Sequence, residues 1–405
     1  MVDQTSKKPH AILVSYPLQG HVIPSVHLAI KLASQGFTIT FINTHAFHHQ
    51  ISKAQPNSEP DIFTKVRESG LDIRYATISD GLPVGFDRSL NHDQYMAALL
   101  HVFSAHVDEV VGQIVKSDDS VRCLIADTFF VWPSKIAKKF GLLYVSFWTE
   151  PALVFSLYYH MDLLRINGHF GCQDCREDII DYIPGVKAME PKDMTSYLQE
   201  AETTSVCHQI IFNAFKDTRS ADFVVCNSVQ ELEVETLSAL QAKMPYYAIG
   251  PLFPSSFTKS FVATSLWSES DCTQWLDEKP RGSVLYVSFG SYAHVTKKDL
   301  AQIANGLSLS KVSFVWVLRA DIVGINLSDR KFVTKEEVSS NINSLFSGKL
   351  GDELRTKIKE VKKTLENALS PGGSSEKNMA QFIKDLKNKI SEKMDQPNKS
   401  ICNDS

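Results

Sequence analysis

Two side chains in the first third of the chain could form one centre for proton transfer. His21 follows a short apolar run at residues 11–16 and precedes a helix whose first turn is expected to hold Pro24. Asp127 follows a second apolar run at residues 123–126. Ligands of an open parallel sheet bind outside the carboxyl ends of its strands, so both side chains are expected at one crevice. An imidazole oriented by a carboxylate could there take a proton from a hydroxyl group.

The spacing alone leaves a second interpretation open. His21 could be a helix-capping or merely exposed histidine, and Asp127 could be the N-cap of a helix that begins near Trp132. Gly20 would let a ligand come close to the backbone in front of His21. The sequence therefore names a candidate pair without fixing its geometry.

The first 250 residues alternate between strand-like and helix-like segments, which is typical of a doubly wound parallel sheet. Gly36 is expected to end the first helix. Strands are predicted at residues 11–16, 37–42, 71–78, 122–126, 143–147, 223–226 and 246–249, and further helices at 92–115 and 133–140. The pattern predicts an α/β fold with a Rossmann-like domain over residues 1–250.

A Pro- and Ser-rich stretch at residues 251–270 is predicted to be a linker to a second domain at 271–405. Strands at 283–288 and 313–318 flank a helix at 297–307 in that domain. The alternation then stops near Val323. A helix over 374–390 follows later, and its apolar residues share one face. These residues are Met379, Phe382, Ile383, Leu386 and Ile390.

Two strands and a stub are too few for a Rossmann-like sheet, which has about five or six strands. At roughly 30 residues per βαβ unit, about 80–90 residues are expected to be missing between Val323 and Gly324. Such a truncated domain should expose apolar surface over residues 284–318 and be prone to aggregate.

The composition argues against several kinds of partner and cross-link. A net charge of −4 over 405 residues gives no reason to expect nucleic acid or an anionic membrane. No apolar run approaches the length of a membrane span, so a cytoplasmic protein is expected. The seven cysteines are odd in number and scattered, which argues against a disulfide framework. The Cys172–Cys175 pair has no second CxxC to complete a zinc site.

A series of short motifs, in the same order and over nearly the whole chain, resembles plant family-1 UDP-glycosyltransferases. This resemblance implies the GT-B fold, with two Rossmann-like domains. The motifs are residues 17–24 (PLQGHVIP), 126–127 (AD), 147–149 (FWT), 182–185 (YIPG), 227–233 (NSVQELE), 249–252 (IGPL), 275–277 (WLD), 284–291 (VLYVSFGS) and 372–375 (GGSS).

The resemblance implies an inverting transfer of a hexose, by default glucose, from a UDP-sugar to a hydroxyl of a small molecule, with no metal. His21 matches the family's base and Asp127 the residue that orients it. Thr149 matches a contact to the donor sugar, and Ser291, beside Gly290 before a helix, matches a contact to the donor phosphate. Candidate acceptor-binding residues are Tyr16, Gly20, Phe129 and Trp148, although ordinary aromatic packing explains the three aromatic side chains equally well.

The chain departs from the family in one place. The long C-terminal signature that binds the uracil, ribose and diphosphate is absent, at the junction where the sheet is already incomplete. UDP-sugar binding is therefore expected to be weak or absent and the chain impaired. An alternative is a non-catalytic acceptor-binding or regulatory splice form that pairs with a full-length relative through its N-terminal half. A Rossmann oxidoreductase is disfavoured, because no G-x-G-x-x-G follows a strand, and nothing points to a phosphorylase of the same architecture.

Overall fold

The computed structural model describes residues 8–55, 61–172, 176–253, 262, 264–267, 271–319 and 333–395. The Val323–Gly324 junction, Cys175 and most of the predicted linker lie outside the described residues. Cys172 is a free thiol. In the part of the chain that is described, no helix is both long and apolar enough to span a bilayer.

Seven parallel strands form the central sheet, in the order β3-β2-β1-β4-β5-β6-β7. They are β1 (His10–Val14), β2 (Thr38–Thr44), β3 (Ile73–Ile78), β4 (Val121–Asp127), β5 (Leu143–Trp148), β6 (Phe223–Cys226) and β7 (Tyr246–Ala248). Strands β2 and β3 follow β1 on one side of the sheet, and β4 then lies on the other side of β1. The strand order therefore reverses between β1 and β4, and ligands of such sheets bind at that point.

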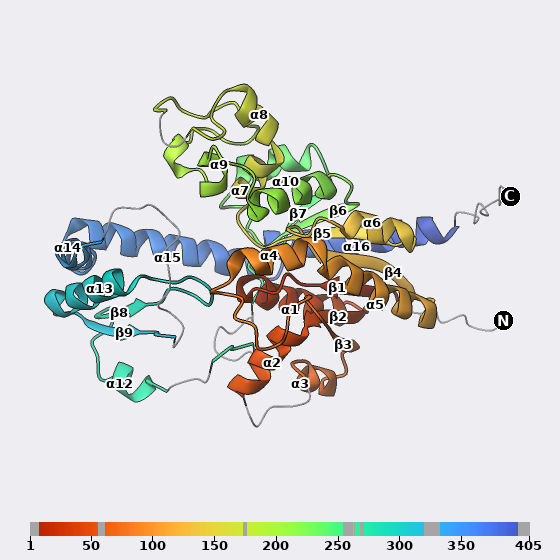
Figure 1. Ribbon diagram of the computed structural model, residues 1–405, viewed down its shortest axis with the longest axis horizontal. Helices are drawn as coiled ribbons and strands as arrows, with labels where there is room; N and C mark the ends of the chain where they lie inside the picture. The colour runs from red at the N-terminus through yellow and green to blue at the C-terminus, as the bar shows by residue number, and fades with distance from the viewer. Residues whose placement is uncertain are drawn as a thin grey trace.

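Helices cover both faces of the sheet (Figure 1). In this unit they are α1 (Gln19–Ser34), α2 (His45–Ala54), α3 (Thr64–Glu68), α4 (His92–His101), α5 (Phe103–Ser117), α6 (Pro133–Lys139), α7 (Ala152–Tyr159), α8 (Met161–Ile166), the 3₁₀ turn Pro191–Asp193, α9 (Ser196–Gln199), α10 (Val206–Thr218) and α11 (Val234–Gln241). Every residue of β1 is buried, as expected for a strand covered on both faces. The α/β class predicted from the sequence is confirmed.

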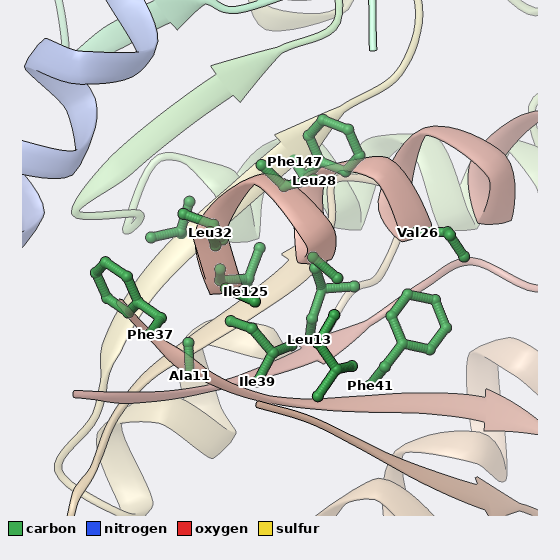
Figure 2. Close-up of a cluster of buried hydrophobic side chains, with 14 of the residues drawn as sticks. Ala11, Leu13, Val26, Leu28, Leu32, Phe37, Ile39, Phe41, Ile125 and Phe147 are labelled. Carbon is green, nitrogen blue, oxygen red and sulfur yellow. The ribbon is translucent and has the colours of Figure 1, made fainter. Parts of the chain in front are cut away.

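The core between α1 and the sheet fixes the start of α1. Leu28 and Leu32 of α1 share one buried cluster with Leu13, Ile39 and Phe41 on the strands, and Figure 2 shows Leu28 beside Phe147. These side chains are at most 1 % exposed. Each such burial stabilises the fold by about 1.5–3 kcal/mol. The helix that carries His21 is therefore held rigidly against β1 and β2.

The last helix, α16 (Ser374–Asp395), packs on the first unit. Its apolar face joins the core cluster of β1, β2 and α1, and in Figure 1 it runs behind that sheet. Asn378 Nδ2 donates to the Ala248 carbonyl at 2.8 Å, and the Ser375 hydroxyl donates to the Gly250 carbonyl. The amphipathic helix predicted at 374–390 is confirmed. Its packing, however, assigns it to the first unit, whereas the sequence division places it in the second.

The second unit contains two described strands, β8 (Val284–Val287) and β9 (Ser313–Trp316), which pair in parallel. Its helices are α12 (Thr273–Asp277), α13 (Lys297–Ser310), α14 (Lys335–Phe346) and α15 (Lys349–Leu369). The predicted exposure of apolar surface is confirmed: Tyr286 is 67 % exposed and Phe314 is 39 % exposed. Because Phe314 pairs with Leu285, the neighbour of Tyr286, the two exposed side chains lie on opposite faces of this small sheet within the described residues.

Two local predictions were wrong. The first helix begins at Gln19, so Pro24 lies in its second turn, where its missing N–H would have faced the Gly20 carbonyl. The single helix expected over 92–115 is two helices that meet at Val102. The Val102 side chain lies against Gly81, where an added Cβ would come within 2.8 Å of it, so close packing accompanies the bend.

Candidate active site

His21 and Asp127 meet where the strand order reverses. His21 lies in the first turn of α1, just beyond β1, and Asp127 is the last residue of β4. The turn between β1 and α1 is fixed by Tyr95, whose hydroxyl donates to the Pro17 carbonyl at 3.0 Å. His21 Nδ1 lies 2.7 Å from Asp127 Oδ2. The pair expected from the sequence is therefore formed in the structure.

The remaining hydrogen bonds decide between the two interpretations of this pair. Asp127 Oδ1 accepts the backbone N–H of Phe129 at 2.9 Å, and the N-cap of α6 is Trp132. Asp127 is therefore not that cap. The N-cap of α1 is Leu18, so the interpretation of His21 as a capping residue is also wrong. An ionised carboxylate only accepts hydrogen bonds, so Nδ1 carries the proton that faces Asp127, and in the neutral imidazole Nε2 keeps its lone pair.

The surroundings of His21 favour its protonated form. Its side chain is only 12 % exposed. Burial alone lowers the pKa of His21. The charge and hydrogen bond of Asp127, together with the charge of Glu150, outweigh burial and raise the pKa above its ordinary value. The imidazole is thus a stronger base than a free histidine while remaining largely shielded from water.

Thr149 and Glu150 follow β5 and complete the surroundings of the imidazole. Thr149 Oγ1 lies 3.0 Å from His21 Nδ1. Burial raises the pKa of Glu150, as does the charge of Asp127, while His21 opposes the rise. The sequence predicted a site role for Thr149 but missed Glu150. The only sequence signal was its place directly after Thr149.

The three predicted acceptor-binding aromatics form one contiguous group beside His21. The ring of Tyr16 lies 5.4 Å from the imidazole and that of Phe129 lies 5.7 Å from it, between ring centroids. Trp148 lies behind Phe129, with the ring centroids 5.2 Å apart and the planes tilted; it is fully buried and donates its Nε1–H to the Pro151 carbonyl. Phe129 and Tyr16 therefore border His21 directly, and Trp148 supports Phe129 from the core.

Gly20, Gly290 and Ser291, the remaining predicted binding residues, have different surroundings. A Cβ at Gly20 would meet no atom within 4 Å, so the space in front of that backbone is open. Gly290 has a φ of +73° and its carbonyl accepts from Arg319. Ser291 does not stand at a helix N-terminus: α13 begins at Lys297 and is capped by the Thr296 hydroxyl. The helix-dipole argument for an anion contact at Ser291 is therefore wrong.

A cavity of ≈ 310 Å³ lies between the two units, adjacent to the start of α1. Residues from the turn before α1, from α2 and from the 80–91 loop line it, and Trp267, Ser291 and Tyr292 close its other side. Sequence reasoning missed the cavity residues His49, Lys53, Trp267 and Tyr292. They carry no motif, and only the docking of the two units brings them together.

Tyr292 of the second unit lines this cavity and forms hydrogen bonds with the first unit. The Tyr292 hydroxyl donates to the Arg88 carbonyl at 2.9 Å and lies 2.8 Å from His92 Nδ1. Arg88 in turn binds Asp80 through two hydrogen bonds, of 2.7 and 2.9 Å. The loop that borders the cavity is thus anchored on both sides.

Two relatives and one solved structure place the chain among known proteins. It is 49 % identical to UDP-glycosyltransferase 86A1 of Arabidopsis thaliana over 476 positions, which cover 96 % of each chain. It is 67 % identical to UDP-glycosyltransferase 86A2 of the same plant over 315 residues, which are 78 % of this chain and 65 % of that relative. No family model matches the chain.

The fold agrees with that of solved glycosyltransferases. The structure of Phytolacca americana UGT2 complexed with UDP-2fluoro-glucose and pterostilbene superposes with a TM-score of 0.71 at 20 % identity, covering 94 % of this chain and 100 % of that one. The 49 % identity over 96 % of both chains shows the family, and the likeness to the solved structure shows the fold. The chain therefore belongs to the plant UDP-glycosyltransferase family and has its GT-B fold.

Proposed function

We propose that His21 is the general base of an inverting hexose transfer from a UDP-sugar to a hydroxyl of a small molecule. The observation that carries the proposal is the 2.7 Å contact from His21 Nδ1 to Asp127, which leaves Nε2 to accept a proton. The acceptor O–H proton passes to Nε2 while the acceptor oxygen bonds to the anomeric carbon. The bond from that carbon to the diphosphate breaks, and its electron pair leaves with UDP. Asp127 stabilises the imidazolium that forms.

The acceptor is expected to enter from the cavity between the units. Tyr16 and Phe129 border the imidazole, and the open space at Gly20 connects to the turn that lines the cavity. An aromatic or otherwise apolar alcohol fits such surroundings. Glucose is the sugar we propose, since the solved structure of similar fold holds a fluorinated UDP-glucose.

The donor half of the reaction is proposed to be impaired in this chain. The described part of the second unit has a two-stranded sheet that exposes large apolar side chains. The match to the relative 86A1 spans 476 positions, more than the 405 residues of this chain, so part of that relative has no counterpart here. Each lost charged contact weakens binding by about 1.5–3 kcal/mol, and several together approach the roughly 8 kcal/mol of a micromolar complex.

Isothermal titration of the full chain with UDP-glucose tests the impairment. The expected result is no saturable heat at micromolar ligand, and a micromolar dissociation constant would contradict it. Transfer to pterostilbene at millimolar UDP-glucose tests the base. Any turnover is expected to fall about 10²–10⁴-fold in His21→Ala. Turnover that survives in this variant would remove His21 from the role.

The second candidate is a non-catalytic form that binds an acceptor or regulates a full-length relative by pairing with it. The exposed Tyr286 and Phe314, on opposite faces of the small sheet, favour it, because large apolar side chains on a sheet are normally covered. Both residues lie in the second unit, whereas the sequence pointed to pairing through the N-terminal half. Co-purification with a full-length relative would support this candidate, and a stable monomer in its presence would contradict it.

A further inference from the structure

A second cavity lies at the opposite end of α1 from His21. Its volume is ≈ 570 Å³, which is within the range of small-molecule sites. His21 lies in the first turn of α1, and Lys31, which lines the cavity, lies in the last turn. The end of α15 and the first turns of α16 complete the lining. Since α1 has 16 residues and is about 24 Å long, this cavity is separate from the β1–β4 crevice.

The part of the lining that comes from α15 and α16 is largely apolar. Leu369 is the last residue of α15, and Met379 and Ile383 lie one turn apart on α16. Met379 and Ile383 are buried and belong to the same core cluster as Leu28 and Leu32 of α1. The core therefore fixes this apolar surface, which can cover the apolar part of a ligand.

Lys31 is the cation that α1 contributes to the cavity. Its side chain is half-buried, and among the described residues its ammonium group makes no hydrogen bond or ion pair. Burial lowers the pKa of Lys31, and the charge of Glu376 opposes that effect. The ammonium is thus partly removed from water without an anion of the described chain at bonding distance. A bound anion would offset the free energy that this burial costs.

The charges in the lining favour a ligand with a single negative charge. Among the described residues that line the cavity, Glu376 is the only acid, and its Oε2 accepts the backbone N–H of Gly372 at 2.5 Å. This carboxylate lies in the first turn of α16, where the helix dipole stabilises it. Lys377 adds a second cation. Two lysines and one glutamate give the lining a net charge of +1, which matches a monoanion better than a dianion such as a phosphate ester.

We propose that this cavity binds a small amphiphilic monocarboxylate, whose carboxylate pairs with the Lys31 ammonium while its apolar chain lies on Leu369, Met379 and Ile383. Lys31 belongs to α1 and the apolar residues belong to α15 and α16, so the bound molecule connects these helices. A ligand that binds only the folded chain stabilises it, so such an acid should strengthen the docking of α16 on the first unit. The inference does not depend on the proposed role of His21.

Titration of the full chain with octanoate, followed by NMR of ¹³C-methyl-labelled methionine, tests the proposal. The Met379 signal is identified by its loss in Met379→Leu. It is expected to shift saturably with octanoate, while the signal of Met161, which is similarly buried on α8, stays in place. 1-Octanol, which lacks the charge, should bind about 10-fold more weakly or worse. A Met379 signal that octanoate does not move, or equal binding of octanoate and 1-octanol, would overturn the proposal.

Variants of Lys31 separate the ion pair from general apolar binding. Lys31→Met keeps most of the length of the side chain and removes a half-buried charge, so the variant is expected to fold. It should weaken octanoate binding by about 10-fold or more and leave 1-octanol binding unchanged, whereas Lys31→Arg should retain octanoate binding. Lys116→Met is the matched control, because Lys116 lies in the last turn of α5 and is exposed. Equal octanoate affinity in Lys31→Met and Lys116→Met would overturn the assignment of this site.

Discussion

His21 Nδ1 and Asp127 Oδ2 lie 2.7 Å apart although the two residues are 106 positions apart in the sequence. They meet because β1 and β4 are neighbours at the point where the strand order of the sheet reverses. The core between α1 and the sheet fixes the first residue, and the pairing of Asp127 with Phe147 on β5 fixes the second. The proposed chemistry and the predictions for the site all depend on this contact.

The stability contributed by the pair should depend on pH in a defined direction. The folded chain raises the pKa of His21, so the pair stabilises fully below the unfolded value near pH 6.5 and loses that contribution as pH rises through the folded pKa. Asp127→Asn should therefore reduce the free energy of unfolding by about 1.5–3 kcal/mol below pH 6.5 and by less at pH 9. Urea unfolding across this range measures it. A difference that does not change with pH would contradict the charge interaction.

The Glu233 side chain is predicted to hold the start of α7 in place. Its two oxygens accept the N–H groups of Ala152 and Leu153 at 2.9 and 2.8 Å, and it also accepts the Ser228 hydroxyl. Glu233→Ala should lower the free energy of unfolding by about 0.5–2 kcal/mol, as for the loss of a helix cap. Glu177→Ala, at an exposed position, is the comparison, and thermal melting separates the two variants. Equal melting temperatures would show that the cap adds nothing.

The sequence supported some of these features and not others, for physical reasons. His21 and Asp127 could be found because short apolar runs indicate buried strands. Residues that directly follow parallel strands lie at the same edge of the sheet. The spacing of apolar residues in α16 showed a helix, but an apolar stripe at Met379 and Phe382 does not say which domain it covers. Glu150 was missed, since one acidic residue after a strand has no pattern until the neighbouring strands are placed.

The ion pair of Arg88 and Asp80 is predicted to keep the 80–91 loop in its present shape. Asp80 is 2 % exposed and Arg88 is 12 % exposed, and the guanidinium also donates to the carbonyl of Phe86 at 2.9 Å. Arg88→Ala leaves a buried carboxylate without its cation and should destabilise the chain by about 3–5 kcal/mol. Chemical unfolding measures this. The double variant Arg88→Ala with Asp80→Ala should recover part of the loss, and no recovery would contradict the pairing.

Helix α16 is predicted to be required for the stability of the first unit. Phe382 is fully buried and its ring lies 5.9 Å from that of Phe223 on β6. Phe382→Ala should reduce the free energy of unfolding by about 3–5 kcal/mol. The exposed Lys384→Ala on the same helix controls for the substitution itself. A loss below about 1 kcal/mol would show that α16 does not pack on this core in solution.

The central claim is that Asp127 holds His21 as a proton acceptor at the β1–β4 crevice. The pKa of His21, measured by ¹⁵N NMR in the native chain and in Asp127→Asn, tests it most directly. The account predicts a value above that of a free histidine in the native chain, and a lower one in the variant, where burial is no longer offset. An unchanged pKa in Asp127→Asn would contradict the claim.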